Sequence, residues 1–263
     1  MRIDLTFSDR HVAFDMGYDP MSIADVTTKH LFERDNACEP EVMHLMNRVL
    51  RLGDVAVDIG ANIGVFTLFM SRLVGDSGQV LAFEPGSNNI SKLRENVKLN
   101  GMMNVEIHTV PLWSRNEEVV LYLRHDSGMN SLRSDEQALS RSRLIAHRLD
   151  EYCATVRPRL IKIDVEGAEA EVLLGGKRTL LAPVPYIICE LNQGALALFN
   201  STQKDLRELM RSYGYEMFVL NGNGSMPIHV PRETKVESRK PNLNVLFSSL
   251  LDVSQAYPEI RCE

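Results

Sequence analysis

One stretch near the start of the chain constrains the fold more than any other: Val55 to Phe66, with the sequence VAVDIGANIGVF. An apolar, β-branched run ends at Asp58, passes through a turn bracketed by Gly60 and Gly64, and enters an apolar segment with helical spacing. Glycines let the backbone approach a ligand and adopt angles that other residues resist. The following helix directs its N-terminal amides at the same place. The stretch therefore predicts a strand, a tight turn and a helix, as at the first strand of a doubly wound, cofactor-binding α/β sheet.

The acid at the end of this strand indicates which cofactor the turn would bind. The dinucleotide fingerprint needs three glycines as G-x-G-x-x-G, and the turn from Gly60 to Gly64 does not supply them. The Asp58 carboxylate would repel a pyrophosphate, but it would attract a ligand that carries an ammonium and a sulfonium. A second predicted strand, 79–84, ends at Glu84, which is well placed to accept hydrogen bonds from ribose hydroxyls. The two acids together favour S-adenosylmethionine over NAD.

Strand and helix patterns alternate along the rest of the chain, which predicts a parallel, doubly wound sheet. Residues 1–52 are expected to form an N-terminal cap or lid, without firm periodicity over 1–38, and a lead-in helix that begins at Glu39-Pro40. Residues 53–263 would form one domain. Its predicted strands are 54–59, 79–84, 104–109, 159–164, 186–190, 215–220 and 244–247, with an added hairpin strand at 117–123.

Four of these strands end in acids, namely Asp58, Glu84, Asp164 and Glu190. Ligands of open α/β sheets bind beyond the carboxyl ends of the strands, and neighbouring strands lie only about 4.8 Å apart. We therefore expect the four carboxylates to ring one crevice. Buried carboxylates need partners, so either a cation lies among them or arginines and backbone amides satisfy them.

Composition narrows the class of protein further. The chain has 263 residues and a net charge of -6, which disfavours general binding to nucleic acid or to an anionic membrane. The first ten residues lack the apolar run of a signal peptide, and no stretch is long enough for a membrane span. The four cysteines are scattered without a C-x-x-C pair, so neither a disulfide framework nor a zinc site is indicated. A cytoplasmic protein is the expectation.

A long polar segment, about 124–148, is rich in arginine and interrupts the regular pattern. Its length and polarity suggest a loop over the cofactor pocket that helps to select the substrate, although a plain solvated loop has the same composition. In the first case the arginines would orient an anionic or sugar-bearing acceptor. They are Arg124, Arg133, Arg141, Arg143 and Arg148.

With these motifs in hand, the chain resembles the FkbM family of S-adenosylmethionine-dependent methyltransferases over about residues 39–220. The most specific match is IKIDVEGAE, from Ile161 to Glu169, and others are Glu39-Pro40, 57–64, 82–85 and Asn100-Gly101. The resemblance implies a class I methyltransferase (Rossmann-like) fold, with a seven-stranded sheet whose last strand is antiparallel. It also implies O-methylation of a hydroxyl on a sugar, glycolipid or secondary metabolite, so the expected partner is a small-molecule or glycan acceptor. The sequence does not define the oligomeric state.

An unactivated hydroxyl benefits from a general base, and Asp164 or Glu166 at the end of the fourth predicted sheet strand would supply it, with His147 and His125 as alternatives. Asp164 and Glu190 would also suit magnesium, but a site without metal is favoured. Trp113, just after the third strand, lies where an adenine could rest. The expected cofactor-binding residues are Glu39, Asp58, Gly60, Ala61, Asn62, Gly64, Phe66, Glu84, Pro85, Trp113 and Asp164.

Three other functions remain open from the sequence. An NAD-dependent oxidoreductase could use the same architecture, although the glycine spacing counts against it. A non-catalytic binding protein would have no need to retain converging acids at the strand ends. N-methylation of a small molecule is the nearest alternative, because an amine acceptor needs less help from a base.

Overall fold

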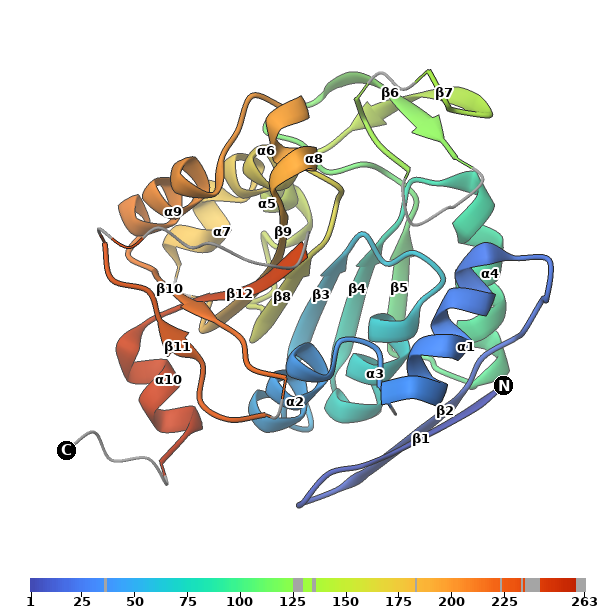
Figure 1. Cartoon of the computed structure of the whole chain (residues 1–263), viewed down its shortest axis with the longest axis horizontal. Helices are drawn as coiled ribbons and strands as arrows, with labels where there is room; N and C mark the ends of the chain where they lie inside the picture. Colours follow the sequence, from blue (N-terminus) through green and yellow to red (C-terminus); the bar gives the residue numbers. More distant parts are fainter. Residues whose placement is uncertain are drawn as a thin grey trace.

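The computed structural model describes residues 1–35, 37–124, 130–133, 136–182, 184–222, 224–232, 234 and 242–258. Within these residues the central feature is an eight-stranded mixed sheet with the strand order β11-β10-β12-β9-β8-β3-β4-β5 (Figure 1). Its strands are β3 (Val55–Ile59), β4 (Gln79–Phe83), β5 (Val105–His108), β8 (Leu160–Ile163), β9 (Tyr186–Asn192), β10 (Glu216–Val219), β11 (Ile228–His229) and β12 (Asn242–Ser248).

The strand directions confirm the predicted doubly wound architecture. β5, β4, β3, β8 and β9 pair in parallel, whereas β12 runs antiparallel to both β9 and β10. The seven longer strands thus form a seven-stranded sheet with an antiparallel last strand. The two-residue strand β11 is an unpredicted addition to the edge beside β10.

Helices cover both faces of the sheet (Figure 1). One face packs against α2, α3, α4 and α10, and the other against α5, α6, α7, α8 and α9. The helices are α1 (Ile23–Asp35), α2 (Pro40–Val49), α3 (Val65–Val74), α4 (Ser87–Leu99), α5 (Leu149–Tyr152), α6 (Glu169–Gly175), α7 (Lys177–Leu181), α8 (Gln193–Leu198), α9 (Gln203–Ser212) and α10 (Leu250–Ala256).

Strand alternation decides which side chains reach each face. On β3, Ala56 belongs to the core under α3, whereas Val57 and Ile59 belong to the core on the opposite face. Asp58 points to the same face as Ala56 because successive side chains of a strand alternate. The residue directly across from Asp58 on β8 is Lys162, and it points to that face as well.

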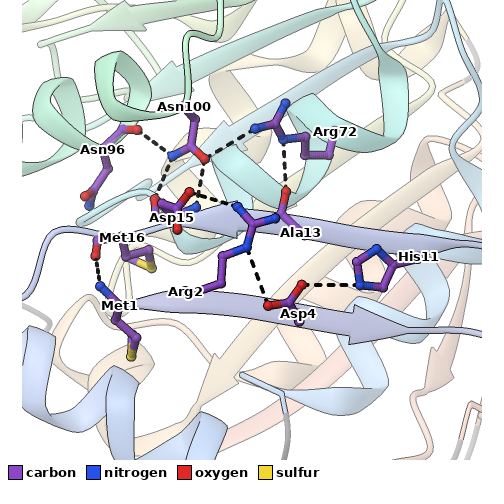
Figure 2. A network of polar contacts seen from close by, with 10 residues as sticks. All are labelled: Met1, Arg2, Asp4, His11, Ala13, Asp15, Met16, Arg72, Asn96 and Asn100. Atoms are coloured by element: carbon purple, nitrogen blue, oxygen red, sulfur yellow. Dashed lines mark hydrogen bonds and ion pairs between the residues drawn. The ribbon is translucent and has the colours of Figure 1, made fainter.

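The first residues form an element that the sequence analysis missed. An antiparallel hairpin joins β1 (Arg2–Thr6) to β2 (His11–Asp15), with apolar side chains alternating along both strands. Asn100, the residue directly after α4, holds the hairpin by accepting from the Asp15 amide at 2.8 Å and donating to the Asp15 carbonyl at 2.6 Å (Figure 2). The hairpin lies at the end of the molecule opposite β6 and β7 (Figure 1).

A second hairpin confirms the added strand predicted at 117–123. β6 (Glu117–Leu123) pairs antiparallel with β7 (Ser140–Ala146) in a small separate sheet. The hairpin follows β5 and lies beyond the carboxyl ends of β3, β4 and β5 (Figure 1). It therefore stands next to the edge of the sheet where α/β proteins bind ligands.

Candidate cofactor and methyl-transfer site

The turn after β3 has the close backbone approach that its glycines predict. Gly60 has φ +85°, and a Cβ atom there would lie 1.8 Å from the carbonyl oxygen of Asp164. Gly64 has φ +99° and caps the N-terminus of α3. Only glycine takes such angles without strain, so the turn passes tightly over the end of β8 and directs the first amides of α3 at the same place.

Two oxygen atoms at this turn are buried without a partner. Asp58 is 1% exposed, and its Oδ2 accepts a hydrogen bond from the Thr67 hydroxyl at 2.5 Å. Asp58 Oδ1 and Asn62 Oδ1 are both buried with no hydrogen-bond partner among the described residues. Buried acceptors of this kind call for a donor, and a ligand ammonium would supply one.

The acid at the end of β4 is held by the same turn. Glu84 Oε2 accepts from the Asn62 amide at 2.8 Å, and its Oε1 accepts from the Gly86 amide at 2.7 Å. Burial raises the pKa of Glu84 to about 7, although these amides lower it. The carboxylate is thus fixed in orientation, and it can accept further hydrogen bonds from a pair of hydroxyls.

A cavity of about 660 Å³, a volume that includes space open to solvent, lies beside Glu84. Its walls come from the ends of β3, β4 and β8, from the segment after β5, and from the β6–β7 region. They are Ile59, Gly60, Asn62, Phe83, Glu84, Pro85, Asn89, Val110, Pro111, Leu112, Leu121, Asn130, Leu132, Asp164, Val165, Glu166 and Ala168. The apolar part of this lining suits a flat aromatic base, and the acid suits a sugar.

A second cavity of about 640 Å³ lies under α1 and shares Gly60, Asn62 and Asp164 with the first. The two cavities therefore meet at the glycine turn. The remaining lining residues of the second cavity are Ala24, Thr27, Thr28, Leu31, Cys38, Glu39, Ala61, Ile63, Val65, Phe66 and Lys162.

A buried lysine stands among the acids at this junction. Lys162 is 2% exposed, and its Nζ lies 2.9 Å from Asp164 Oδ2. Burial raises the pKa of Asp164, but the charge and hydrogen bond of the Lys162 ammonium and a hydrogen bond from Glu190 together outweigh it, so the Asp164 pKa is below its ordinary value. The charges of Asp164, Glu39 and Asp58 in turn outweigh burial and raise the pKa of Lys162.

Two neighbouring acids behave in the opposite way. Burial, followed by the charge of Asp164, raises the pKa of Glu190 to about 9. Burial also raises the pKa of Glu39 to about 7, despite the Lys162 ammonium and a hydrogen bond from Asn244. The four carboxylates expected to ring one crevice thus fall into two groups. Glu84 lines the first cavity, whereas Asp58, Asp164 and Glu190 surround Lys162.

Oxygen atoms of Asp164, Glu166 and Glu190 lie within 4.8 Å of one another. Acidic groups of this kind are common without an ion, and the Lys162 ammonium already contacts Asp164. The described residues show no further feature that points to a cation, so we assign no metal to these three acids.

Asp58 and Gly64, which were expected to bind the cofactor, line neither cavity, and two further expected residues lie elsewhere. The Trp113 ring packs against Phe199, with ring centroids 6.1 Å apart, and His147 Nδ1 lies 3.3 Å from Glu151 Oε2. Neither residue lines the two cavities. His125, the other alternative base, lies outside the described residues.

The arginines of segment 124–148 do not line the cavities within the part of the chain that the structure describes. Arg143 pairs with Glu118 across the β6–β7 hairpin at 3.0 Å, and Arg148 pairs with Glu151 of α5 at 3.3 Å; both arginine side chains are exposed. Asn130 and Leu132 are the residues of this segment that reach the first cavity.

Lys162 is the main residue that the sequence analysis missed. Its signal was a charged residue between Ile161 and Ile163 in an otherwise apolar strand. A central strand of a parallel sheet is buried on both faces, so a lysine there must find an acidic partner.

Strand order, the antiparallel last strand and the acid-flanked glycine turn define this chain as a class I methyltransferase. The family description "Methyltransferase FkbM domain" matches residues 58–217, well over half of the chain. The chain belongs to the FkbM methyltransferase family.

Individual relatives are more distant. Methyltransferase 1 of Beauveria bassiana is 31% identical over 142 residues, which cover 45% of this chain and 57% of that protein. The hexuronic acid methyltransferase AglP of Haloferax volcanii is 28% identical over 167 residues, which cover 61% of this chain and 65% of that protein. The chain thus spans less than two thirds of the length of each. A solved FkbM methyltransferase from Methylobacillus flagellatus aligns over 88% of this chain and 56% of its own, with 17% identity and a TM-score of 0.47.

No helix among the described residues is both long enough and apolar enough to cross a membrane.

Proposed function

We propose that this protein transfers a methyl group from S-adenosylmethionine to a hydroxyl of a sugar or another small molecule. The observation that carries the proposal is the position of Asp164, which lines both cavities at the point where they meet. A two-part ligand that filled both cavities would have its centre beside this carboxylate.

The residues of the two cavities fit the parts of S-adenosylmethionine. Glu84 would hold the ribose hydroxyls, and the apolar wall that includes Pro85 and Leu112 would hold the adenine. The unpartnered Oδ1 atom of Asn62, which lines both cavities, would accept from the ammonium of the methionine part. Asp58 lines neither cavity, and its unpartnered Oδ1 would add negative charge behind the turn. The net negative charge around the turn also favours a sulfonium.

Bound S-adenosylmethionine supplies an electrophilic methyl group: the acceptor oxygen forms the new C–O bond, the C–S bond breaks, and its electron pair stays on sulfur. Asp164 takes the hydroxyl proton, because its side chain is 23% exposed at the junction, its pKa is below the ordinary value despite burial, and Lys162 holds it at 2.9 Å. The walls of the two cavities supply alignment, which is worth roughly 7–11 kcal/mol in well-oriented reactions.

Segment 124–148, through Asn130 and Leu132, would help to select the acceptor, with α1 as the cap of the second cavity. The Haloferax relative is named a hexuronic acid methyltransferase. A sugar hydroxyl is therefore the first acceptor to test.

The test is a transfer assay with S-adenosylmethionine and a panel of hexuronides, neutral glycosides and hydroxylated metabolites, read as the gain of one methyl group. Because a general base is worth about 10²–10⁴ in rate, Asp164→Asn should lower kcat by that factor. Calorimetry should show that the variant still binds the cofactor.

Glu208→Gln is the matched control, since this acid is 65% exposed on α9. It should keep the wild-type rate. Wild-type turnover by Asp164→Asn would remove Asp164 from the mechanism. Methylation of amines only would replace the proposed O-methylation.

A further inference from the structure

The ammonium of Lys162 lies in an unusual place for a lysine. It is on the central strand β8, 2% exposed, with its Nζ 2.9 Å from Asp164 Oδ2 and 4.6 Å from the centre of the Phe66 ring. A buried ammonium is costly unless it is paired, so a lysine with a structural role alone would be a poor choice compared with an apolar residue.

The groups around Lys162 explain why a positive charge is needed. It faces acids from four separate parts of the fold: the residue before α2, β3, the end of β8, and β9. The contribution from α3 is the uncharged ring of Phe66, and the amide of Asn244 on β12 donates to Glu39, one of these acids. The titratable groups that face Lys162 within the described structure are Cys38, Glu39, Asp58, Asp164, Cys189 and Glu190, and Glu169 also faces Asp164.

Among these acids, only one contacts the ammonium directly at hydrogen-bond distance within the described structure, and that is Asp164. Asp164 is also the acid that lines both cavities. Among the described residues, Lys162 lines the second cavity but not the first, so its ammonium leaves the part of Asp164 that faces the first cavity accessible.

We propose that Lys162 is a positioning residue for methyl transfer: its ammonium fixes the orientation and the negative charge of the Asp164 carboxylate. The inference rests on the proposed function. It explains how one carboxylate can stay ionised beside Glu166 and Glu190, whose oxygens lie within 4.8 Å. Asp164 then receives the acceptor hydroxyl proton as the C–O bond forms and the C–S bond breaks, while Lys162 keeps its own protons throughout.

The test compares Lys162→Met, which removes the charge, with Lys162→Arg, which keeps it. The first readout needs no cofactor: carbon NMR of the protein labelled at aspartate carboxyl carbons, with the Asp164 signal assigned by its loss in Asp164→Asn. In Lys162→Met the Asp164 signal should titrate about 1–3 pH units higher than in the wild type. In Lys162→Arg it should stay near the wild-type position.

The second readout is the pH profile of kcat. The acidic limb should move upward in Lys162→Met and stay in place in Lys162→Arg, with kcat at neutral pH reduced about 10-fold or more in the Met variant. In the Asp164→Asn background, Lys162→Met should cause little further loss, because the lysine acts through Asp164.

An unchanged Asp164 titration in Lys162→Met would overturn the inference. So would a double variant, Asp164→Asn with Lys162→Met, in which the kcat losses of the two single variants multiply. If Lys162→Met does not fold, Lys162→Arg decides alone: an acidic limb displaced upward despite the retained charge would contradict the inference. Methyl transfer by the wild type is measured in the same series. If the wild type transfers no methyl group, the proposed function is refuted, and the Asp164 titration alone then tests the role of Lys162.

Discussion

At the scale of single residues, the site depends on positions where only one residue type fits. Gly60 combines a positive φ with the 1.8 Å approach of its missing Cβ to the Asp164 carbonyl. Gly214 also has a positive φ, +94°, but a Cβ there would meet nothing within 4 Å. A comparison of substitutions at the two glycines therefore separates the cost of a left-handed backbone from the cost of a steric clash at the Cβ atom.

Both Gly60→Ala and Gly214→Ala should pay the strain of a left-handed backbone, about 1–2 kcal/mol. Gly60→Ala should cost about 1–3 kcal/mol more, because the methyl group must displace the end of β8. Urea denaturation measures both costs, and calorimetry should show weakened cofactor binding for Gly60→Ala only. Equal stability and equal affinity of the two variants would show that the turn does not need the close approach.

At the scale of elements, α4 connects the N-terminal hairpin to the glycine turn through one side chain. Asn96 is fully buried; its Oδ1 accepts from the Gly17 amide at 2.8 Å, and its Nδ2 donates to the Ile63 carbonyl at 2.8 Å. Asn100, one turn later, holds the hairpin at Asp15 without touching the glycine turn. Figure 2 shows Asn96 and Asn100 beside Asp15 of the hairpin.

Asn96→Leu would leave two buried backbone groups unpaired, at about 1–3 kcal/mol each. We expect a lower urea midpoint and a weaker affinity for S-adenosylmethionine, because the carbonyl of Ile63 belongs to the cofactor turn. Asn100→Leu is the matched control and should lower stability without changing the affinity. Loss of affinity in both variants, or in neither, would contradict this division of roles.

At the scale of the whole molecule, the periodic parts of the sequence predicted the fold well. Four of the five parallel strands, β3, β4, β8 and β9, are largely apolar and have an acid at or next to their carboxyl ends. The sequence therefore predicted these strands and the edge of the sheet where their acids gather. The FkbM membership rested on contiguous motifs, which a linear reading can detect. The N-terminal hairpin was missed even though Ile3, Leu5, Val12 and Phe14 alternate as a strand requires, because each run is only five residues long.

The site was harder to predict than the fold, because its chemistry depends on contacts between distant segments. The alternation of β8 places Lys162 opposite Asp58, and the bend before α2 brings Glu39 to the same ammonium. Neither contact has a local sequence signal. Trp113 was expected near the adenine because it follows β5, but its ring packs against Phe199, which comes much later in the chain.

The whole account depends on S-adenosylmethionine lying across both cavities with its ribose on Glu84. The free carboxyl of Glu84 has a pKa raised to about 7 by burial, and ribose hydroxyls donate to its ionised form. Binding therefore favours loss of the proton, so affinity should rise between pH 6 and pH 8, with the steepest change near the free-state pKa.

Isothermal titration calorimetry of the wild type and Glu84→Gln, with S-adenosylmethionine and with NAD at several pH values, tests this most directly. We predict binding of S-adenosylmethionine and not of NAD. Glu84→Gln should bind about ten- to hundredfold more weakly, since it loses charged hydrogen bonds, and with a smaller pH dependence. Preference for NAD, or an affinity that Glu84→Gln leaves unchanged at every pH, would contradict the account.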